Sequence, residues 1–287
     1  MDLEHIYVPT GEGVYLHCVL AGPVGAAPLV AVHGGPDWDH SYLLDPLTVL
    51  GHRRLVLPDL RGCGRSSPGP CSFAAAARDL ARLVRHLGLE RPDLLGFSAG
   101  GQVVQRLVLD HPGPFGRVIM ASSTLWPVTD ADFGPWPERE RRRAAEARIW
   151  SMPGPVTPAR VRRAALAGAP ANVWRGDRIV HYRRVLERVR WSAHWLRALR
   201  AGRLDPPRPA DGPRRLAEAD AAWLFLHGRQ DMLFPAHVAE RAAVLLPRSR
   251  AVVLDGAGHM AHVDRPEAWI GAVEDFLSGR AQAPGAA

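Results

Sequence analysis

The sequence predicts an α/β protein built on a mostly parallel, doubly wound sheet, with a helical lid inserted after the sixth strand. Short apolar runs alternate with amphipathic stretches between residues 28 and 121, and the same alternation returns after residue 222. Between these two parts lies a long segment with helical patterning and no convincing strand. Alternation of this kind is typical of βαβ units, whose parallel strands are buried on both faces.

The first part of the chain supplies the six strands that precede the lid. Two alternating stretches, 4–9 and 14–20, flank Thr10-Gly11-Glu12-Gly13 and predict a hairpin. The continuous apolar run 28–32 predicts a strand that is buried on both faces. The next expected elements are strand 54–57, helix 73–87 ended by Gly88, strand 92–95, helix 101–110 and strand 118–121.

Residues 125–215 are the predicted lid, and residues 1–124 and 216–280 are the predicted core. The lid segment holds six of the nine tryptophans and is bordered by prolines. One apolar stripe at helical spacing predicts that the stretch from Asp177 to Leu199 is strongly helical. The stripe consists of Ile179, Tyr182, Leu186, Val189, Ala193 and Leu196.

The sheet pattern resumes at 222–227 and continues to the end of the core. We expect a helix at 236–246, a strand at 251–254 and a final helix at about 265–277. Residues 281–287, with the sequence AQAPGAA, are expected to form a disordered tail.

Composition indicates a soluble globular protein of the cytoplasm. The chain has 287 residues, of which 47% are apolar and 23% charged, and no apolar run is long enough to span a membrane. The first residues, MDLEHIYVPTGEG, carry acids and lack a basic–apolar signal pattern. Three cysteines without metal-ligand spacing favour a reduced compartment over a disulfide framework.

The formal net charge of +7 comes entirely from arginine, because all 36 basic residues are Arg. No nucleic-acid-binding motif accompanies this charge, so we expect no nucleic-acid partner. The lid holds 20 Arg and 9 Asp or Glu, a surplus of 11 positive charges. An acidic carrier protein is therefore a candidate partner beside a small-molecule substrate, whereas the oligomeric state is left open.

The sequence around Ser98 predicts a nucleophile on a sharp strand-to-helix turn. An apolar run ends in Gly96-Phe97-Ser98-Ala99-Gly100, and an amphipathic stretch follows at once. Glycines on both sides of the serine allow a strand and a helix to approach closely. This is the G-x-S-x-G pattern of the nucleophile elbow.

A serine nucleophile needs a base, and the base needs an acid that orients it. Asp231 follows the strand at 222–227, and His259 follows the strand at 251–254. Both would lie with Ser98 at the carboxyl edge of the sheet, in the chain order Ser, Asp, His. His262 is the competing base, and Asp130 and Asp132 are the competing acids.

An oxyanion hole requires backbone N–H groups aimed at the developing negative charge. Ala99 is expected to supply one, and the glycine loop His33-Gly34-Gly35-Pro36 the other. Gly35 is the first candidate and Gly34 the alternate. His33 is expected to pin this loop by hydrogen bonds. Asp37, Asp39 and His40 could contact substrate, but solvated loop residues are the simpler expectation for all three.

Five segments together resemble the α/β-hydrolase superfamily over nearly the whole chain: HGGPD, PDLRGCGRS, GFSAGG, HGRQD and GAGHM. The HGGP loop and the GG after the elbow are similar to the proline iminopeptidase branch, serine peptidases that remove N-terminal residues. Two features depart from that branch. A small residue, Ala99, follows the nucleophile, and the lid glutamates that the resemblance implies for binding an ammonium are absent after Trp150-Ser151 and at Ile179-Val180.

Asp177 or Glu187 could replace those glutamates, although helix-surface salt bridges are the simpler expectation for both. An Arg-rich lid lined with tryptophan would repel an ammonium and would suit an apolar or acidic acyl group. Candidates for the substrate pocket are Gly34, Phe97, Trp126, Trp150 and Met260.

The expected activity is serine hydrolysis of an ester, amide or thioester of a small, largely apolar molecule, through an acyl-enzyme and without a metal or organic cofactor. The first alternative is an aminopeptidase-like amidase of the proline iminopeptidase type. The second is a non-hydrolytic cyclase, an acyltransferase or a ligand-binding protein, because a fold alone does not determine function.

Overall fold

One eight-stranded sheet organises the protein, whose computed structural model describes residues 2–280. The strand order is β1-β2-β4-β3-β5-β6-β7-β8. The pairs β1–β2 and β2–β4 are antiparallel and all other neighbours are parallel, which confirms the expected fold class. The tail expected at 281–287 lies outside the described residues. The strands are β1 (Leu3–Gly11), β2 (Val14–Ala21), β3 (Pro28–Val32), β4 (Arg54–Pro58), β5 (Asp93–Phe97), β6 (Val118–Ala121), β7 (Trp223–Gly228) and β8 (Ser249–Leu254).

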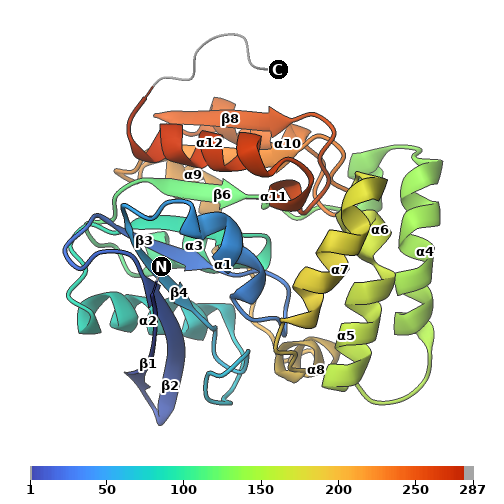
Figure 1. Cartoon of the computed structure of the whole chain (residues 1–287), viewed down its shortest axis with the longest axis horizontal. Helices are drawn as coiled ribbons and strands as arrows, with labels where there is room; N and C mark the ends of the chain where they lie inside the picture. Colours follow the sequence, from blue (N-terminus) through green and yellow to red (C-terminus); the bar gives the residue numbers. More distant parts are fainter. Residues whose placement is uncertain (1, 281–287) are drawn as a thin grey trace.

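Helices cover both faces of this sheet (Figure 1). Alternate residues of each central strand face opposite layers, as in β3, where Val30 and Val32 pack on one side and Leu29 and Ala31 on the other. The first layer contains α2 (Phe73–His86), α3 (Ala99–Asp110), α9 (Gly212–Ala217) and α10 (His237–Leu245). The second contains α1 (Ser41–Thr48), α11 (Ala261–Asp264) and α12 (Pro266–Leu277).

A buried ion pair connects the loop after β4 to the first layer of helices. The guanidinium of Arg61 donates from Nε and Nη2 to the two carboxylate oxygens of Asp79 in α2, across 2.6 and 2.8 Å. Both side chains are at most 2% exposed. Two parallel charge-assisted hydrogen bonds give such a pair a defined geometry.

The described residues between β6 and β7 form helices and no strand. Figure 1 shows α4 to α8 grouped beyond the arrowhead of β6, on one side of the sheet. The boundary expected at residue 215 falls inside α9, which packs against α3 and α10. The helices of this segment are η1 (Asp130–Phe133), α4 (Pro137–Ser151), α5 (Pro158–Ala167), α6 (Ala169–Asn172), η2 (Gly176–Arg178), α7 (Ile179–Glu187) and α8 (His194–Arg200).

The stretch from Asp177 to Leu199 is largely helical, but it is not one helix, because residues 188–193 separate α7 from α8. The backbone N–H groups of Trp195 and Leu196, in the first turn of α8, donate to the carboxylate of Asp37 across 3.0 and 2.9 Å. A distant carboxylate thus satisfies N–H groups that have no acceptor within the helix, and α8 begins as a separate element.

Among residues 2–280, no helix combines the length and the apolar character needed to cross a membrane.

Candidate active site

Ser98 lies between β5 and α3 in a backbone conformation that few residues adopt. Its φ is 52° and its ψ −120°, and α3 starts at the next residue. A Cβ on Gly96 would lie 2.5 Å from the Cα of Gly101, and one on Gly100 would lie 2.3 Å from the carbonyl oxygen of Val32. The two glycines of the elbow are therefore required by close backbone contacts, and the turn directs the Ser98 hydroxyl out of the sheet.

The structure brings Ser98, His259 and Asp231 into one line of hydrogen bonds. The Nε2 of His259 is 3.1 Å from the Oγ of Ser98, and its Nδ1 is 2.9 Å from Oδ2 of Asp231. All three side chains are buried. An ionised carboxylate only accepts hydrogen bonds, so Nδ1–H donates to Asp231 and Nε2 is left to accept from the serine hydroxyl.

The surroundings of Asp231 keep its carboxyl group ionised. Burial alone would raise its pKa, but attraction to His259 and hydrogen bonds from His227 and His259 hold the pKa well below its usual range. The other oxygen, Oδ1, accepts the backbone N–H groups of Leu233 and Phe234 across 2.7 and 2.9 Å. The carboxylate is thus fixed in the orientation that meets His259.

The competing residues lie elsewhere. His262 packs its ring edge-on against Phe97, with a centroid distance of 5.2 Å, and neither ring nitrogen has a hydrogen-bond partner within 2–280. Asp132, in η1, accepts hydrogen bonds from Thr129, and Asp130 is 2.9 Å from Arg139. None of the three is in the line that joins Ser98 to Asp231.

In the loop after β3, the N–H of Gly34 has a hydrogen-bond acceptor, whereas the N–H of Gly35 has none among the described residues. The N–H of Gly34 donates to the hydroxyl of Tyr42 across 2.7 Å. Within the described part of the chain, the N–H of Gly35 donates to no protein group. Ala99 is the first residue of α3, where N–H groups lack an acceptor within the helix. The N–H groups of Gly35 and Ala99 are thus available as the two expected oxyanion donors, whereas that of Gly34 is already bonded.

His33 pins the loop as expected. Its Nε2 accepts the N–H of Leu60 across 3.0 Å, and its Nδ1–H donates to the carbonyl oxygen of Gly34 across 2.9 Å. Both nitrogens are therefore occupied. Burial lowers the pKa of His33, so the ring stays neutral and holds one tautomer.

The expectation that Asp37, Asp39 and His40 are solvated is wrong, because all three are at most 3% exposed. Asp37 binds the first turn of α8, and the carboxylate of Asp39 accepts the N–H of Arg190 across 3.1 Å. His40 donates from Nδ1 to Asp59 across 2.6 Å. These side chains hold the lid and the loop after β4, and none of the three lines a cavity together with Ser98 or Ala99.

Asp264 is a positioning residue that sequence reasoning missed. Its carboxylate accepts the N–H of Gly258, directly before His259, across 2.8 Å. It also accepts the N–H groups of Trp174 and Arg175 in the lid, both across 2.9 Å. One buried side chain thus fixes both the histidine loop and the adjacent lid segment.

A cavity of about 200 Å³ opens onto Ser98 and His259. Of the expected pocket residues, Phe97, Trp150 and Met260 line it. The expectation for Trp126 is wrong: it lines neither this cavity nor the next one, and its ring packs instead under the guanidinium of Arg241, with the Cζ 4.0 Å from the ring centroid. The turn at Thr124, whose hydroxyl bonds to the backbone of Trp126, directs that ring toward α10.

Glu146 also lines this cavity, and the sequence interpretation did not identify it. It lies one helical turn before Trp150, whose Nε1–H donates to its Oε1 across 3.2 Å. Burial raises the pKa of Glu146. No Arg of the described chain lies within 4.0 Å of this carboxylate, and no Arg lines the cavity. The lid arginines are therefore absent from the lining of this cavity, and the repulsion of an ammonium by the lid stays a prediction.

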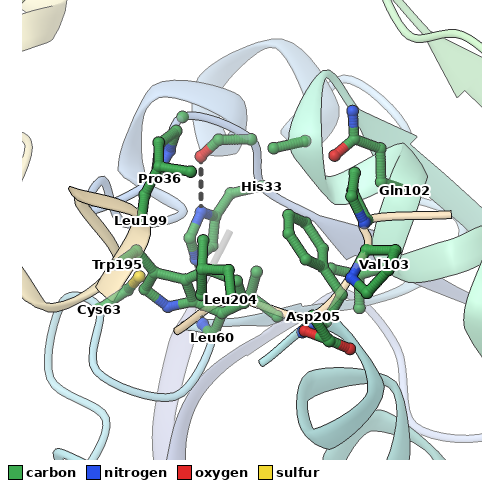
Figure 2. Close-up of a pocket in the computed structure, with 16 residues that line it drawn as sticks. His33, Pro36, Leu60, Cys63, Gln102, Val103, Trp195, Leu199, Leu204 and Asp205 are labelled. Carbon is green, nitrogen blue, oxygen red and sulfur yellow. Dashed lines mark hydrogen bonds between the residues drawn. The ribbon is translucent and has the colours of Figure 1, made fainter. Parts of the chain in front are cut away.

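A second cavity of about 480 Å³ shares Gly35 and Pro36 with the first. Gly34 and Ala99 line it as well, together with apolar side chains from α2, α3, α8 and the loop after α8. Figure 2 shows His33, Pro36 and Gln102 on one side of this cavity and Trp195, Leu204 and Asp205 on the other. The two expected oxyanion donors therefore lie where the two cavities meet.

His17, His40 and Asp59 are the described residues grouped closely enough to hold a metal ion. Both Nδ1 atoms already bond to the Asp59 carboxylate, across 2.9 and 2.6 Å. The backbone N–H groups of His40 and Arg65 bind the same carboxylate. Hydrogen bonding accounts for this cluster without an ion.

Known proteins resemble this chain over most of its length. A family model described as the alpha/beta hydrolase fold matches residues 27–266. A protein assigned as carbamate hydrolase RutD from Caulobacter sp. strain K31 is 27% identical over 95% of this chain and 98% of its own length. A proline iminopeptidase from Lactobacillus helveticus is 25% identical over 87% of this chain and 89% of its own. The solved structure of a proline iminopeptidase-related protein from Thermus thermophilus superposes with a TM-score of 0.72, at 26% identity over 97% of this chain and 98% of that one.

Proposed function

The chain belongs to the alpha/beta hydrolase fold family and is an enzyme of that type, and on this premise we propose that it is a serine hydrolase with Ser98 as nucleophile. The observation that carries the proposal is the buried line from Ser98 Oγ through His259 to Asp231. A serine, a base and an orienting acid at hydrogen-bond distances are the arrangement that activates a hydroxyl group.

In the proposed reaction, the Oγ of Ser98 attacks a carbonyl carbon while the Nε2 of His259 removes the hydroxyl proton. The carbonyl oxygen becomes negatively charged and is held by the N–H groups of Gly35 and Ala99. His259 then donates its proton to the leaving oxygen, nitrogen or sulfur, which departs and leaves an acyl-enzyme on Ser98. Water, activated by the same histidine, cleaves that ester and restores the serine.

The proposed substrate is an ester, amide or thioester of a small, largely apolar molecule. The smaller cavity, which Ser98 lines, and the larger one, which Ala99 lines, are both lined mainly by apolar side chains, and the carboxylate of Glu146 is the charged side chain that lines the smaller one. Small-ligand sites are typically apolar, with a few polar groups that orient the ligand.

Intact mass spectrometry tests this proposal directly. We expect a mass increase on the wild-type chain after incubation with a mixed library of esters, amides and thioesters. The adduct should map to Ser98 and be absent in Ser98→Ala. Ser151→Ala, which removes an exposed hydroxyl group, is the matched control and should keep the adduct. Full hydrolysis by Ser98→Ala would overturn the mechanism.

Glu146 favours a second candidate function, an aminopeptidase-like amidase that recognises a free ammonium group. A partly buried carboxylate without an ion pair can bind a cation in the cavity. Aminoacyl-nitroanilides compared with acyl esters that lack an amine separate the two functions. Turnover of the amine-bearing compounds alone, lost in Glu146→Gln, would favour the amidase.

A further inference from the structure

We propose that the two cavities divide the substrate, with the acyl group in the larger one and the leaving group in the smaller one beside Glu146. This inference rests on the proposed serine hydrolase function and deepens it by naming the substrate class. It concerns esters or amides of a bulky, apolar acid with a small alcohol or amine that carries a hydrogen-bond donor or a positive charge.

The position of His259 decides where the leaving group goes. His259 lines the smaller cavity and is not among the residues that line the larger one. The leaving atom must take a proton from Nε2, and a general acid acts only within hydrogen-bond reach. The leaving group must therefore extend from the carbonyl carbon into the smaller cavity.

The remaining substituent is directed to the other side. The tetrahedral carbon carries the Oγ of Ser98, the oxyanion, the leaving group and the acyl chain. Of the proposed oxyanion donors, Ala99 lines only the larger cavity and Gly35 lines both. With the oxyanion held at these residues and the leaving group beside His259, the acyl chain has the larger cavity open to it.

The lining of the larger cavity matches an apolar acyl group. Its volume of about 480 Å³ is within the range of about 300–1,000 Å³ typical of small-ligand sites, whereas the smaller cavity, at about 200 Å³, is below it. Its larger apolar side chains include Leu60, Phe73, Val103, Trp195, Leu199 and Leu204.

Besides His33, whose two nitrogens are occupied, Asp205 and Gln102 are the polar side chains that line the larger cavity. The carboxylate of Asp205 accepts the N–H groups of Phe73 and Ala74 at the start of α2, across 2.7 and 2.9 Å. The carboxamide of Gln102 makes no hydrogen bond within the described chain, and Figure 2 shows it extending along the cavity wall. Gln102 thus offers a partner for one polar atom on an otherwise apolar acyl chain.

The smaller cavity offers a carboxylate to the leaving group. The Trp150 indole occupies Oε1 of Glu146, and no described side chain within 4.0 Å neutralises the group. An ammonium or a hydroxyl group on the alcohol or amine would pair with the free oxygen. In this arrangement Glu146 binds the leaving group. The amidase considered above would instead need Glu146 to bind an ammonium on the acyl group, so the two hypotheses predict opposite positions for the cation.

Four esters test the inference: acetyl and octanoyl esters of choline and of 3,3-dimethylbutanol, its uncharged isostere. We expect kcat/KM of the wild type to be higher for octanoyl than for acetyl esters and higher for choline than for the isostere. Leu204→Trp should lower the octanoyl-to-acetyl ratio by about 10-fold or more, since filling a pocket changes discrimination on this scale. Glu146→Gln should abolish the choline preference and leave the acyl ratio unchanged.

Matched variants keep the test decisive. Leu199→Trp fills the same cavity from a side chain that is 55% exposed, in case Leu204→Trp does not fold. Leu245→Trp, on α10 and outside both cavities, should change neither ratio. If Leu233→Trp, in the smaller cavity, lowers the acyl ratio instead, the assignment of the two cavities is overturned.

A fluorophosphonate probe separates this inference from the proposed function. No labelling of Ser98 together with no turnover of any ester would reject the serine hydrolase itself. Labelling and turnover, with an acyl ratio that stays within twofold in Leu204→Trp and Leu199→Trp, would reject only the division of the substrate.

Discussion

The carboxylate of Asp37 accepts the backbone N–H of Trp195 across 3.0 Å and so joins the oxyanion loop to the start of a lid helix. Asp37 follows Gly35 by two residues, and its backbone oxygen accepts the N–H of Ser192 across 2.9 Å. Its positive φ of 74° is a conformation that aspartate adopts more readily than most residues. The position of the lid and the geometry of the proposed oxyanion hole are therefore coupled through one side chain.

Asp37→Ala should loosen this junction. We expect the free energy of unfolding to fall by about 1–2 kcal/mol, the cost of losing a helix N-cap. Hydrogen exchange at the amides of Trp195 and Leu196 should accelerate. Asp132→Ala, at the start of the exposed η1, is the control and should leave these amides unchanged. Equal exchange rates in Asp37→Ala and the wild type would contradict the role assigned to Asp37.

Asp231→Asn should lower kcat by a factor on the order of 10⁴ while the fold is retained. An amide cannot stabilise the imidazolium and favours the wrong tautomer of His259. Near-ultraviolet circular dichroism checks the fold, and ester turnover at neutral pH checks the rate. A loss below about 10-fold would transfer the orienting role to another acid.

Tyr42→Phe removes the acceptor of the Gly34 N–H and leaves that buried group without a partner. The expected cost is about 1–3 kcal/mol in the free energy of unfolding, measured by urea denaturation. The loop that carries Gly35 should also be held less firmly, so kcat should fall while KM changes little. Tyr15→Phe, at an exposed position, is the control. A Tyr42→Phe variant with unchanged stability would show that this contact is dispensable.

His262→Phe should make the protein more resistant to acid. Burial, followed by repulsion from His259 and His181, lowers the pKa of His262 to about 3, against about 6.5 in an unfolded chain. Between these values the unfolded state binds more protons, so the free energy of unfolding decreases as the pH falls from about 6.5 toward 3.

Removing this group should reduce the slope by up to about 1.4 kcal/mol per pH unit. Urea unfolding at several pH values between 4 and 7 measures the slope. The exposed His237→Phe is the control, and identical slopes in His262→Phe and the wild type would contradict the low pKa.

Asp79→Asn should be strongly destabilising, by about 3–5 kcal/mol, because it leaves the buried guanidinium of Arg61 without its counter-charge. Glu218→Gln breaks the exposed pair with Arg214 and should cost at most about 0.5 kcal/mol. Denaturant titration of both variants tests the contrast. Similar losses in the two variants would mean that burial does not set the strength of these pairs.

The meeting of Ser98, Asp231 and His259 could be anticipated because parallel strands end at the same edge of a sheet. The need for glycine at positions 34, 35, 96 and 100 could be anticipated for a local reason, because the tight turns there leave no room for a side chain.

The lid could not be predicted to the same depth. Glu146 faces the cavity because of how α4 packs on its neighbours, and spacing along one helix does not show which face is covered. The apolar stripe from 179 to 196 continues from α7 into α8 although the two helices pack in different apolar clusters, so the pattern does not reveal the break. In the sequence, Asp37 and Asp39 resemble solvated loop acids, because the backbone N–H groups that bind them belong to residues 190–196, far along the chain.

Gly34 lies so close to the elbow that its residue type cannot change, whereas other positions around the cavities can accept substitutions. A Cβ at Gly34 would lie 2.6 Å from the Cβ of Ser98 and 2.5 Å from the carbonyl oxygen of Phe97, so no other residue fits there. Leu199, Leu204 and Leu233 line the two cavities from less constrained positions. Evolution, or a directed library, can therefore reshape substrate range at these leucines while the catalytic turn is inherited unchanged.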